Sequence, residues 1–289
     1  MNTEAYLDTF SETFIQPFRK PNTVACYQRA FHTLPRSILD TDLQQLTGLQ
    51  LQAALNQKAR KHPRAAQLQY ACLGVAMKKA VALGMLPRSP MEGTVKPIHA
   101  AARAVVLSPD QLARYIDAAR QEPCFPLLLL MATCGLRRGE ALGLQWRDVD
   151  LQAGRISIHQ QRVRINHGYR LQPLKSRASV RVLPIGTPLM GELSRIHVRS
   201  ITGFVHDCTP ESLRKAHLRV LAAEALPPVT LHGLRHSVAT LAAAQGCPMK
   251  ILQGILGHSK YELTANLYAD HLSAENFTSA VEALQSVVL

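Results

Sequence analysis

Residues 232–236 read His232-Gly233-Leu234-Arg235-His236, within a segment whose apolar spacing predicts a helix over 231–245. Two of these residues, His232 and Arg235, are three positions apart, so they share one face of that helix. Gly246 follows at the position where a glycine commonly ends a helix. The pair brings a titratable imidazole close to a permanent cation, which is a candidate site for an anionic substrate.

Three other segments carry groups of the same kind. Residues 135–142, Gly-Leu-Arg-Arg-Gly-Glu-Ala-Leu, place an arginine beside a helix start, and residues 256–259, Leu-Gly-His-Ser, place a histidine after a glycine. Tyr268 lies ten residues beyond that histidine. Metal-free cleavage of a phosphodiester needs a positioned nucleophile, cations on the non-bridging oxygens and an acid for the departing oxygen. These segments supply such groups.

At these residues the sequence resembles the tyrosine recombinase family, in its phage-integrase branch. Five motifs match in order over about 130 residues: G-L-R-x-G-E-x-L, a lysine hairpin at 174–185, H-x-L-R-H, L-G-H-S, and the tyrosine. H-x-x-R alone is frequent by chance, whereas the ordered set is specific. Gly233 stands where the family often has aspartate, and Leu174 where it often has proline; neither supplies a catalytic atom. The match covers residues 104–289 and extends less specifically to 1–98.

The resemblance implies a role for each matched side chain. Tyr268 attacks the scissile phosphate and forms a 3′-phosphotyrosyl link, and Lys175 protonates the departing 5′ oxygen. His232 acts as general base for the tyrosine. The implied catalytic set is Arg137, Lys175, His232, Arg235, His258 and Tyr268, with Glu140 as a supporting acid that forms hydrogen bonds within the site.

Each position also has a simpler interpretation. An isolated tyrosine most often packs in a core, and a lone histidine is most often structural. Tyr261 competes with Tyr268, and Arg138 competes with Arg137. His236 is expected to pack rather than to react.

The charge balance indicates a polyanionic partner. Lys and Arg number 33 against 20 Asp and Glu, giving a formal net charge of +13. Residues 151–191 contain seven cations and no acidic residue, which favours a phosphate-facing surface over a merely solvated one. The candidate DNA-binding residues are Arg138, Arg162, Arg164, Arg177 and Arg181.

The expected fold is mainly α-helical with a small antiparallel β-sheet, in two domains joined by a proline-rich linker near 90–104. The resemblance implies that these form a two-domain DNA clamp, with an N-terminal helical core-binding (SAM-like) domain at 1–98 and a catalytic domain at 99–289. A capping box at Ser108 opens a helix, and alternation at 155–165 and 180–185 predicts strands. The chain is expected to begin directly with the core-binding domain, without an arm-binding module.

The sequence excludes or disfavours several classes of protein. The start lacks a signal peptide, and the longest apolar run, Leu127 to Cys134, is too short to span a membrane. Six cysteines without C-x-x-C spacing predict reduced thiols in a cytoplasmic protein, with no metal site. The DNA-acting family that the chain resembles implies association with the nucleoid. No Walker A loop is present. No cofactor is expected.

The resemblance implies partners as well. These are double-stranded DNA at specific recombination sites, a homotetramer on synapsed DNA, and an excisionase or host DNA-bending factor. The apolar stripe at 277–288 docks either on a neighbouring protomer or on its own domain. Three functions stay open: an integrase of a mobile element, an Xer-type recombinase that resolves chromosome or plasmid dimers, and a catalytically silent DNA-binding accessory protein.

Overall fold

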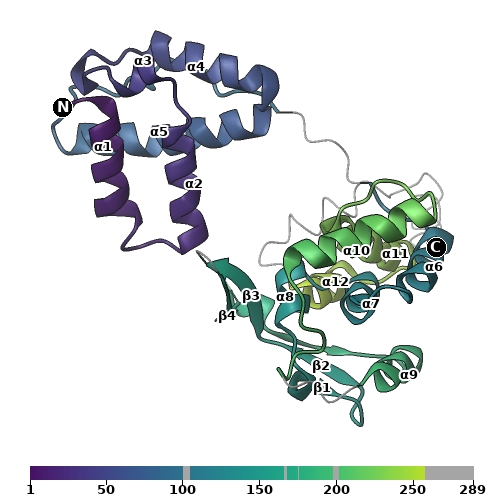
Figure 1. The fold of residues 1–289 in the computed structure, drawn as a ribbon. Helices are drawn as coiled ribbons and strands as arrows, with labels where there is room; N and C mark the ends of the chain where they lie inside the picture. The colour runs from purple at the N-terminus through teal and green to yellow at the C-terminus, as the bar shows by residue number, and fades with distance from the viewer. Residues whose placement is uncertain (100–104, 166–167, 175, 198–201, 258–289) are drawn as a thin grey trace, which may run out of the picture. The chain divides into compact units, whose positions relative to one another are not determined.

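The computed structural model describes residues 1–99, 105–165, 168–174, 176–197 and 202–257. The chain divides into two compact units, Met1–Ala102 and Arg103–Leu289. Both are mainly helical, and the second carries short antiparallel strands (Figure 1). The expected fold class is confirmed. No helix within the described ranges has the length and apolar character needed to cross a bilayer.

The first unit consists of helices around an aromatic core. Phe10 contacts Phe31 edge-on at a ring-centroid distance of 6.1 Å, and both are buried. The α5 helix packs against α2 and α4, and Gly84 follows it with a positive φ of 70°. The elements are α1 (Thr3–Phe10), a π-helical turn (Ser11–Ile15), α2 (Pro21–His32), α3 (Arg36–Leu39), a 3-10 turn (Leu43–Gln45), α4 (Gly48–Lys61) and α5 (Pro63–Ala82).

The second unit is built around one buried helix, α7 (Phe125–Cys134), which contains the longest apolar run of the sequence. Helices α6, α10 and α11 pack against it. The expected capping box is confirmed, because the Ser108 hydroxyl accepts from the backbone of Gln111 while the Gln111 side chain accepts from the backbone of Ser108. The remaining helices are α6 (Pro109–Ala119), α8 (Arg138–Gly143), a 3-10 turn (Trp146–Asp148), α9 (Thr187–Ile196), α10 (Pro210–Ala223), α11 (Leu231–Ala244) and α12 (Met249–Leu256).

The strands form two antiparallel groups. β1 (Val149–Asp150), β2 (Arg155–Ile158) and β5 (Arg181–Pro184) form a sheet in the order β1-β2-β5. Ile156 pairs with Leu183, and both side chains enter the core of the second unit. The other group is a hairpin of β3 (Gln160–Ile165) and β4 (Gly168–Pro173). The predicted strands are therefore present.

A glycine allows α8 to lie directly on the hairpin. A Cβ built on Gly143 would approach the backbone nitrogen of Arg162 to 2.8 Å, which no larger residue tolerates. This contact fixes the short helix that follows Arg137 against β3.

Candidate active site

Glu140 is the centre of a hydrogen-bonded arginine cluster in the second unit. Its side chain is 2% exposed. Both carboxylate oxygens accept from Arg181, whose Nη1 and Nη2 lie 3.2 and 2.9 Å away. Burial alone raises the pKa of Glu140, but the hydrogen bonds and positive charges of Arg181 and Arg137 outweigh it and lower that pKa. Glu140 is therefore an ionised carboxylate that orients cations.

Arg137 occupies the position just before α8. Its backbone nitrogen donates to Glu140 Oε2 at 3.0 Å and its Nη1 donates to Oε1 at 2.7 Å. Its Nη2 donates to the carbonyl oxygen of Gly257 at 2.8 Å. The side chain remains about one third exposed, at 34%. Part of the guanidinium is therefore held in place while part faces solvent.

Arg235 reaches the same place from α11. Its side chain is buried, at 1% exposure. Nη1 donates to the carbonyl oxygen of Gly135 at 2.8 Å, and Nη2 donates to that of Leu256. These carbonyls end α7 and α12, where helix dipoles are negative and favour a cation. Burial and the charge of Arg137 lower the pKa of Arg235 to about 9, so it is still protonated at neutral pH.

Two histidines on α11 lie beside these arginines. The rings of His232 and His236 meet edge-on with centroids 4.6 Å apart. Desolvation by the surrounding protein lowers the pKa of His232, because water stabilises the charged imidazole less well there. Repulsion by His236, Arg235 and Arg137 lowers it further, to about 4. Its imidazole is therefore neutral at pH 7 and can accept a proton. His236 is half-buried, and its Nδ1 has no hydrogen-bond partner within the described ranges.

The cluster carries a positive charge that suits an anion. Arg137, Arg181 and Arg235 contribute three positive charges against the one negative charge of Glu140, a net of +2. The two sequence-predicted arginines meet at consecutive carbonyls, those of residues 256 and 257. Arg137, at 34% exposure, can present part of its guanidinium to a phosphate, whereas the buried Arg235 adds positive charge behind it in this structure.

The profile of the phage integrase family matches residues 106–275, more than half of the chain. The chain belongs to the phage integrase family. This confirms the tyrosine recombinase family that the sequence motifs indicate.

Curated relatives of this integrase-family chain are distant. It is 26% identical over 212 residues to a tyrosine recombinase XerC-like protein of Caldanaerobacter subterraneus, covering 63% of this chain and 54% of the relative. It is 26% identical over 254 residues to the prophage integrase IntF of Escherichia coli, covering 80% of this chain and 51% of the relative. The chain thus spans about half the length of these two relatives.

Solved integrase structures share the fold. The Tn1549 transposon integrase in complex with a circular intermediate DNA aligns with a TM-score of 0.84 and 19% identity, covering 98% of this chain and 99% of that one. A lambda integrase tetramer bound to a Holliday junction aligns with a TM-score of 0.70 and 20% identity, covering 90% and 78%. The likeness at this identity concerns the fold.

The structure brings together four of the seven residues predicted for catalysis and its support, namely Arg137, Glu140, His232 and Arg235. Lys175, His258 and Tyr268 lie outside the described residues, as does the competing Tyr261. The roles assigned to all seven stay predictions.

The five arginines predicted to contact DNA have different surroundings in this integrase-family chain. Arg138 and Arg177 are exposed. Arg162 donates to Asp207 and lies over the ring of Phe204, with its guanidinium carbon 4.9 Å from the centroid. Arg164 is exposed and lies 3.5 Å from Glu211. Arg181 is buried against Glu140, so in this structure its charge is directed inward.

Sequence reasoning missed how much of the site is made by backbone and by Arg181. Besides Glu140, Arg181 also donates from Nε to the carbonyl of Ile255 at 2.7 Å. It thereby links β5 to α12. The sequence signal was available in the hairpin motif, where Arg181 follows Lys175 by six residues, but an inward orientation cannot be read from spacing.

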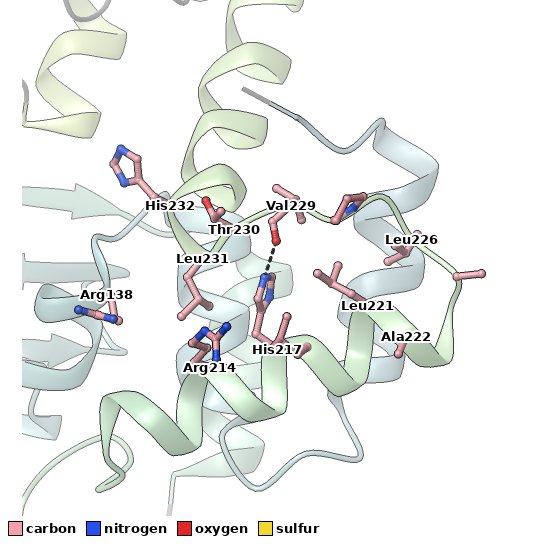
Figure 2. Close-up of a pocket in the computed structure, with 13 residues that line it drawn as sticks. Arg138, Arg214, His217, Leu221, Ala222, Leu226, Val229, Thr230, Leu231 and His232 are labelled. Atoms are coloured by element: carbon pink, nitrogen blue, oxygen red, sulfur yellow. Dashed lines mark hydrogen bonds between the residues drawn. The ribbon is translucent and has the colours of Figure 1, made fainter. Parts of the chain in front are cut away.

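A groove of about 830 Å³ begins beside His232 (Figure 2). It runs between α10 and the segment 226–232, and Arg138 and Arg214 lie at the end near the histidine. His217 points from α10 towards this segment, where its Nε2 bonds the carbonyl of Val229 at 2.8 Å. This bond fixes the start of α11 and therefore the backbone that carries His232.

Proposed function

We propose that this chain is a site-specific DNA recombinase that cleaves and rejoins strands through a covalent link to Tyr268. One observation carries the proposal: Arg137 and Arg235 donate to the carbonyls of consecutive residues 256–257. The next residue is His258, which opens the segment containing the candidate nucleophile. Two guanidiniums are therefore anchored where that segment starts.

The proposed chemistry is a pair of transesterifications. The phenolic oxygen of Tyr268 attacks the scissile phosphorus, a tyrosyl O–P bond forms, and the P–O5′ bond breaks. A phenol has a pKa near 10 and needs a base. His232 takes its proton, because its low pKa keeps it neutral before DNA binds and the charge of the bound phosphate then raises that pKa. Lys175 gives a proton to the departing 5′ oxygen.

The remaining groups stabilise the transition state. Arg137, Arg235 and His258 bind the non-bridging oxygens, on which negative charge develops. Glu140 accepts hydrogen bonds from both the backbone nitrogen and the Nη1 of Arg137. The guanidinium is therefore already positioned and needs little reorganisation during the reaction. The phosphotyrosyl link conserves the energy of the broken bond, so rejoining requires neither ATP nor a metal ion.

Duplex DNA is the proposed substrate of both units. Residues 1–98 carry 12 Lys and Arg against 6 Asp and Glu, and the remainder carries 21 against 14, so both portions are positive. We assign core-site binding to the first unit and catalysis to the second. Four copies assemble on two recombining sites, an arrangement for which the lambda integrase tetramer on a Holliday junction is the fold-level precedent.

Integration or excision of a mobile element is the role we favour. The prophage, transposon and phage names among the related proteins support it. An adjacent excisionase gene and attachment site would favour this role, whereas a chromosomal dimer-resolution site would favour an Xer-type role.

Trapping of the covalent intermediate tests the proposal. A pool of nicked suicide duplexes from the DNA flanking the gene is incubated with the full chain, and protein–DNA adducts are resolved under denaturing conditions. We expect an adduct on the 3′ phosphate that is absent in Tyr268→Phe and retained in Tyr261→Phe, with DNA binding intact in both. An adduct that persists in Tyr268→Phe would place the nucleophile elsewhere.

A further inference from the structure

Two cysteines and a histidine meet at a place that the proposed reaction does not use. Cys124 is buried at the residue that precedes α7. His206 and Cys208 are half-buried in the loop that leads to α10. Their three ligand atoms lie within 4.8 Å of one another. The loop and the start of α7 therefore present S, N and S donors to one point.

The spacing fits a small tetrahedral ion. Zinc binds thiolate sulfur at about 2.3 Å and imidazole nitrogen at about 2.0 Å. Two sulfurs on a tetrahedral zinc consequently lie about 3.8 Å apart. The separations here, at most 4.8 Å, require a contraction of about 1 Å or less, which side-chain rotation in the half-buried loop can provide.

The donor chemistry selects a soft ion. Thiolate and neutral imidazole favour zinc over magnesium or calcium. The nearby carboxylates are engaged elsewhere: Glu122 accepts from Arg219, and Asp207 accepts from Arg162. We propose that Cys124, His206 and Cys208 bind one Zn²⁺ ion, with water as the fourth ligand.

The proposed ion ties a loop to the core rather than taking part in strand cleavage. Cys124 precedes α7 and Gly135 follows it, so at 1.5 Å per residue the two lie about 16 Å apart. The catalytic arginine Arg235 binds at the Gly135 end. The loop also carries Asp207, which pairs with Arg162 of β3. Zinc would therefore hold together α7, the loop and, through that ion pair, the basic hairpin.

The sequence alone argues against this site. Zinc motifs are recognised by close cysteine pairs such as C-x-x-C, whereas Cys124 and Cys208 are separated by 208 − 124 = 84 positions. Only folding brings the donors together.

Cobalt spectroscopy on the reduced full chain tests the proposal. We expect one equivalent of Co²⁺ to give thiolate-to-cobalt charge transfer and the intense visible absorption of a tetrahedral site, and one equivalent of Zn²⁺ to abolish both. Zinc at about 100 times its Kd should raise the Tm of the second unit by roughly 5–10 °C.

Variants then assign the ligands. Loss of an outer-shell partner weakens metal binding 10- to 100-fold, so Cys208→Ser and His206→Ala should weaken it by at least about 100-fold. Cys26→Ser is the matched control, because it removes one member of the Cys26–Cys72 thiol pair, and among the described residues this pair is not part of a three-donor cluster. Its cobalt spectrum should equal that of the unaltered chain.

Two results would overturn the proposal, and both are obtained on the unaltered chain. One is the absence of a charge-transfer band at micromolar Co²⁺, which would leave the three residues as packed core groups. The other is a Cys124–Cys208 disulfide, found by mass spectrometry, in protein that carries no zinc. Neither result bears on the Tyr268 adduct.

Discussion

Arg181 Nη2 donates to Glu140 Oε2 at 2.9 Å, and the two side chains are 6% and 2% exposed. The pair joins β5 to α8 inside the second unit. Because Glu140 also binds Arg137, the buried pair sets the position of the partly exposed arginine that we assign to the phosphate. The Glu140 carboxylate therefore both stabilises the buried Arg181 and positions the arginine proposed to act in catalysis.

Glu140→Gln should destabilise the second unit by about 3–5 kcal/mol, because Arg181 stays buried without a charged partner. Urea denaturation measures the free energy of unfolding. Asp150→Asn is the control, since it weakens the solvent-exposed pair with Arg155, 3.1 Å apart, and should change the free energy of unfolding far less than Glu140→Gln does. Equal losses in both variants would contradict the central place of Glu140.

Arg235→Lys should slow adduct formation by about 100-fold, because a lysine cannot donate to the carbonyls of both Gly135 and Leu256 and so displaces the charge behind the proposed phosphate site. Loss of a hydrogen bond to a buried carbonyl should also cost about 1–3 kcal/mol of stability. Single-turnover cleavage and urea denaturation report the two effects. Arg36→Lys, at an exposed ion pair of the first unit, should change neither.

Stability should fall as the pH drops below about 6.5. His217 is 2% exposed and bonds Tyr115 and Val229, and burial lowers its pKa from 6.5. The unfolded state then binds a proton that the folded state resists, so acid favours unfolding by up to about 1.4 kcal/mol per pH unit for each such group.

Urea denaturation between pH 7.5 and 5 measures this slope, and His217→Gln should reduce it by up to one proton. His206, His232 and His236, whose pKa values are also lowered, contribute to the slope in the same direction. An unchanged slope in His217→Gln would show that its burial is not coupled to proton uptake.

Excess EDTA, added together with the DNA, should leave adduct formation unchanged. In the part of the chain that the structure describes, the carboxylate bonded to the arginine cluster is Glu140. Both of its oxygens already accept hydrogen bonds from arginines, so they are not free to bind a metal ion. A magnesium-dependent nuclease in the same buffer confirms that chelation is complete. A requirement for divalent metal that added Mg²⁺ restores and Zn²⁺ does not would contradict the proposed arginine clamp, because the zinc site proposed above lies outside it.

The helices and strands of the second unit could be predicted because each depends on local signals. The Ser108 capping box, the apolar run from Leu127 and the glycines at 246 and 257 behave as expected, the last two with φ of 77° and 61°. The gathering of Arg137, Glu140, His232 and Arg235 was available from motif spacing as an expectation of the family. The inward orientation of Arg181 was not, since it depends on contacts with α8 and α12.

The sequence by itself determined the element types, the excess of positive charge and the ordered motifs, because periodicity, capping and charge are properties of short segments or of simple sums. Only the tertiary structure decided which cations pair inward and which face solvent, and that Cys124 meets His206 and Cys208. Those outcomes depend on burial and on contacts between residues far apart in the chain. Such contacts exist only once α7, α11, α12 and the loop before α10 have packed.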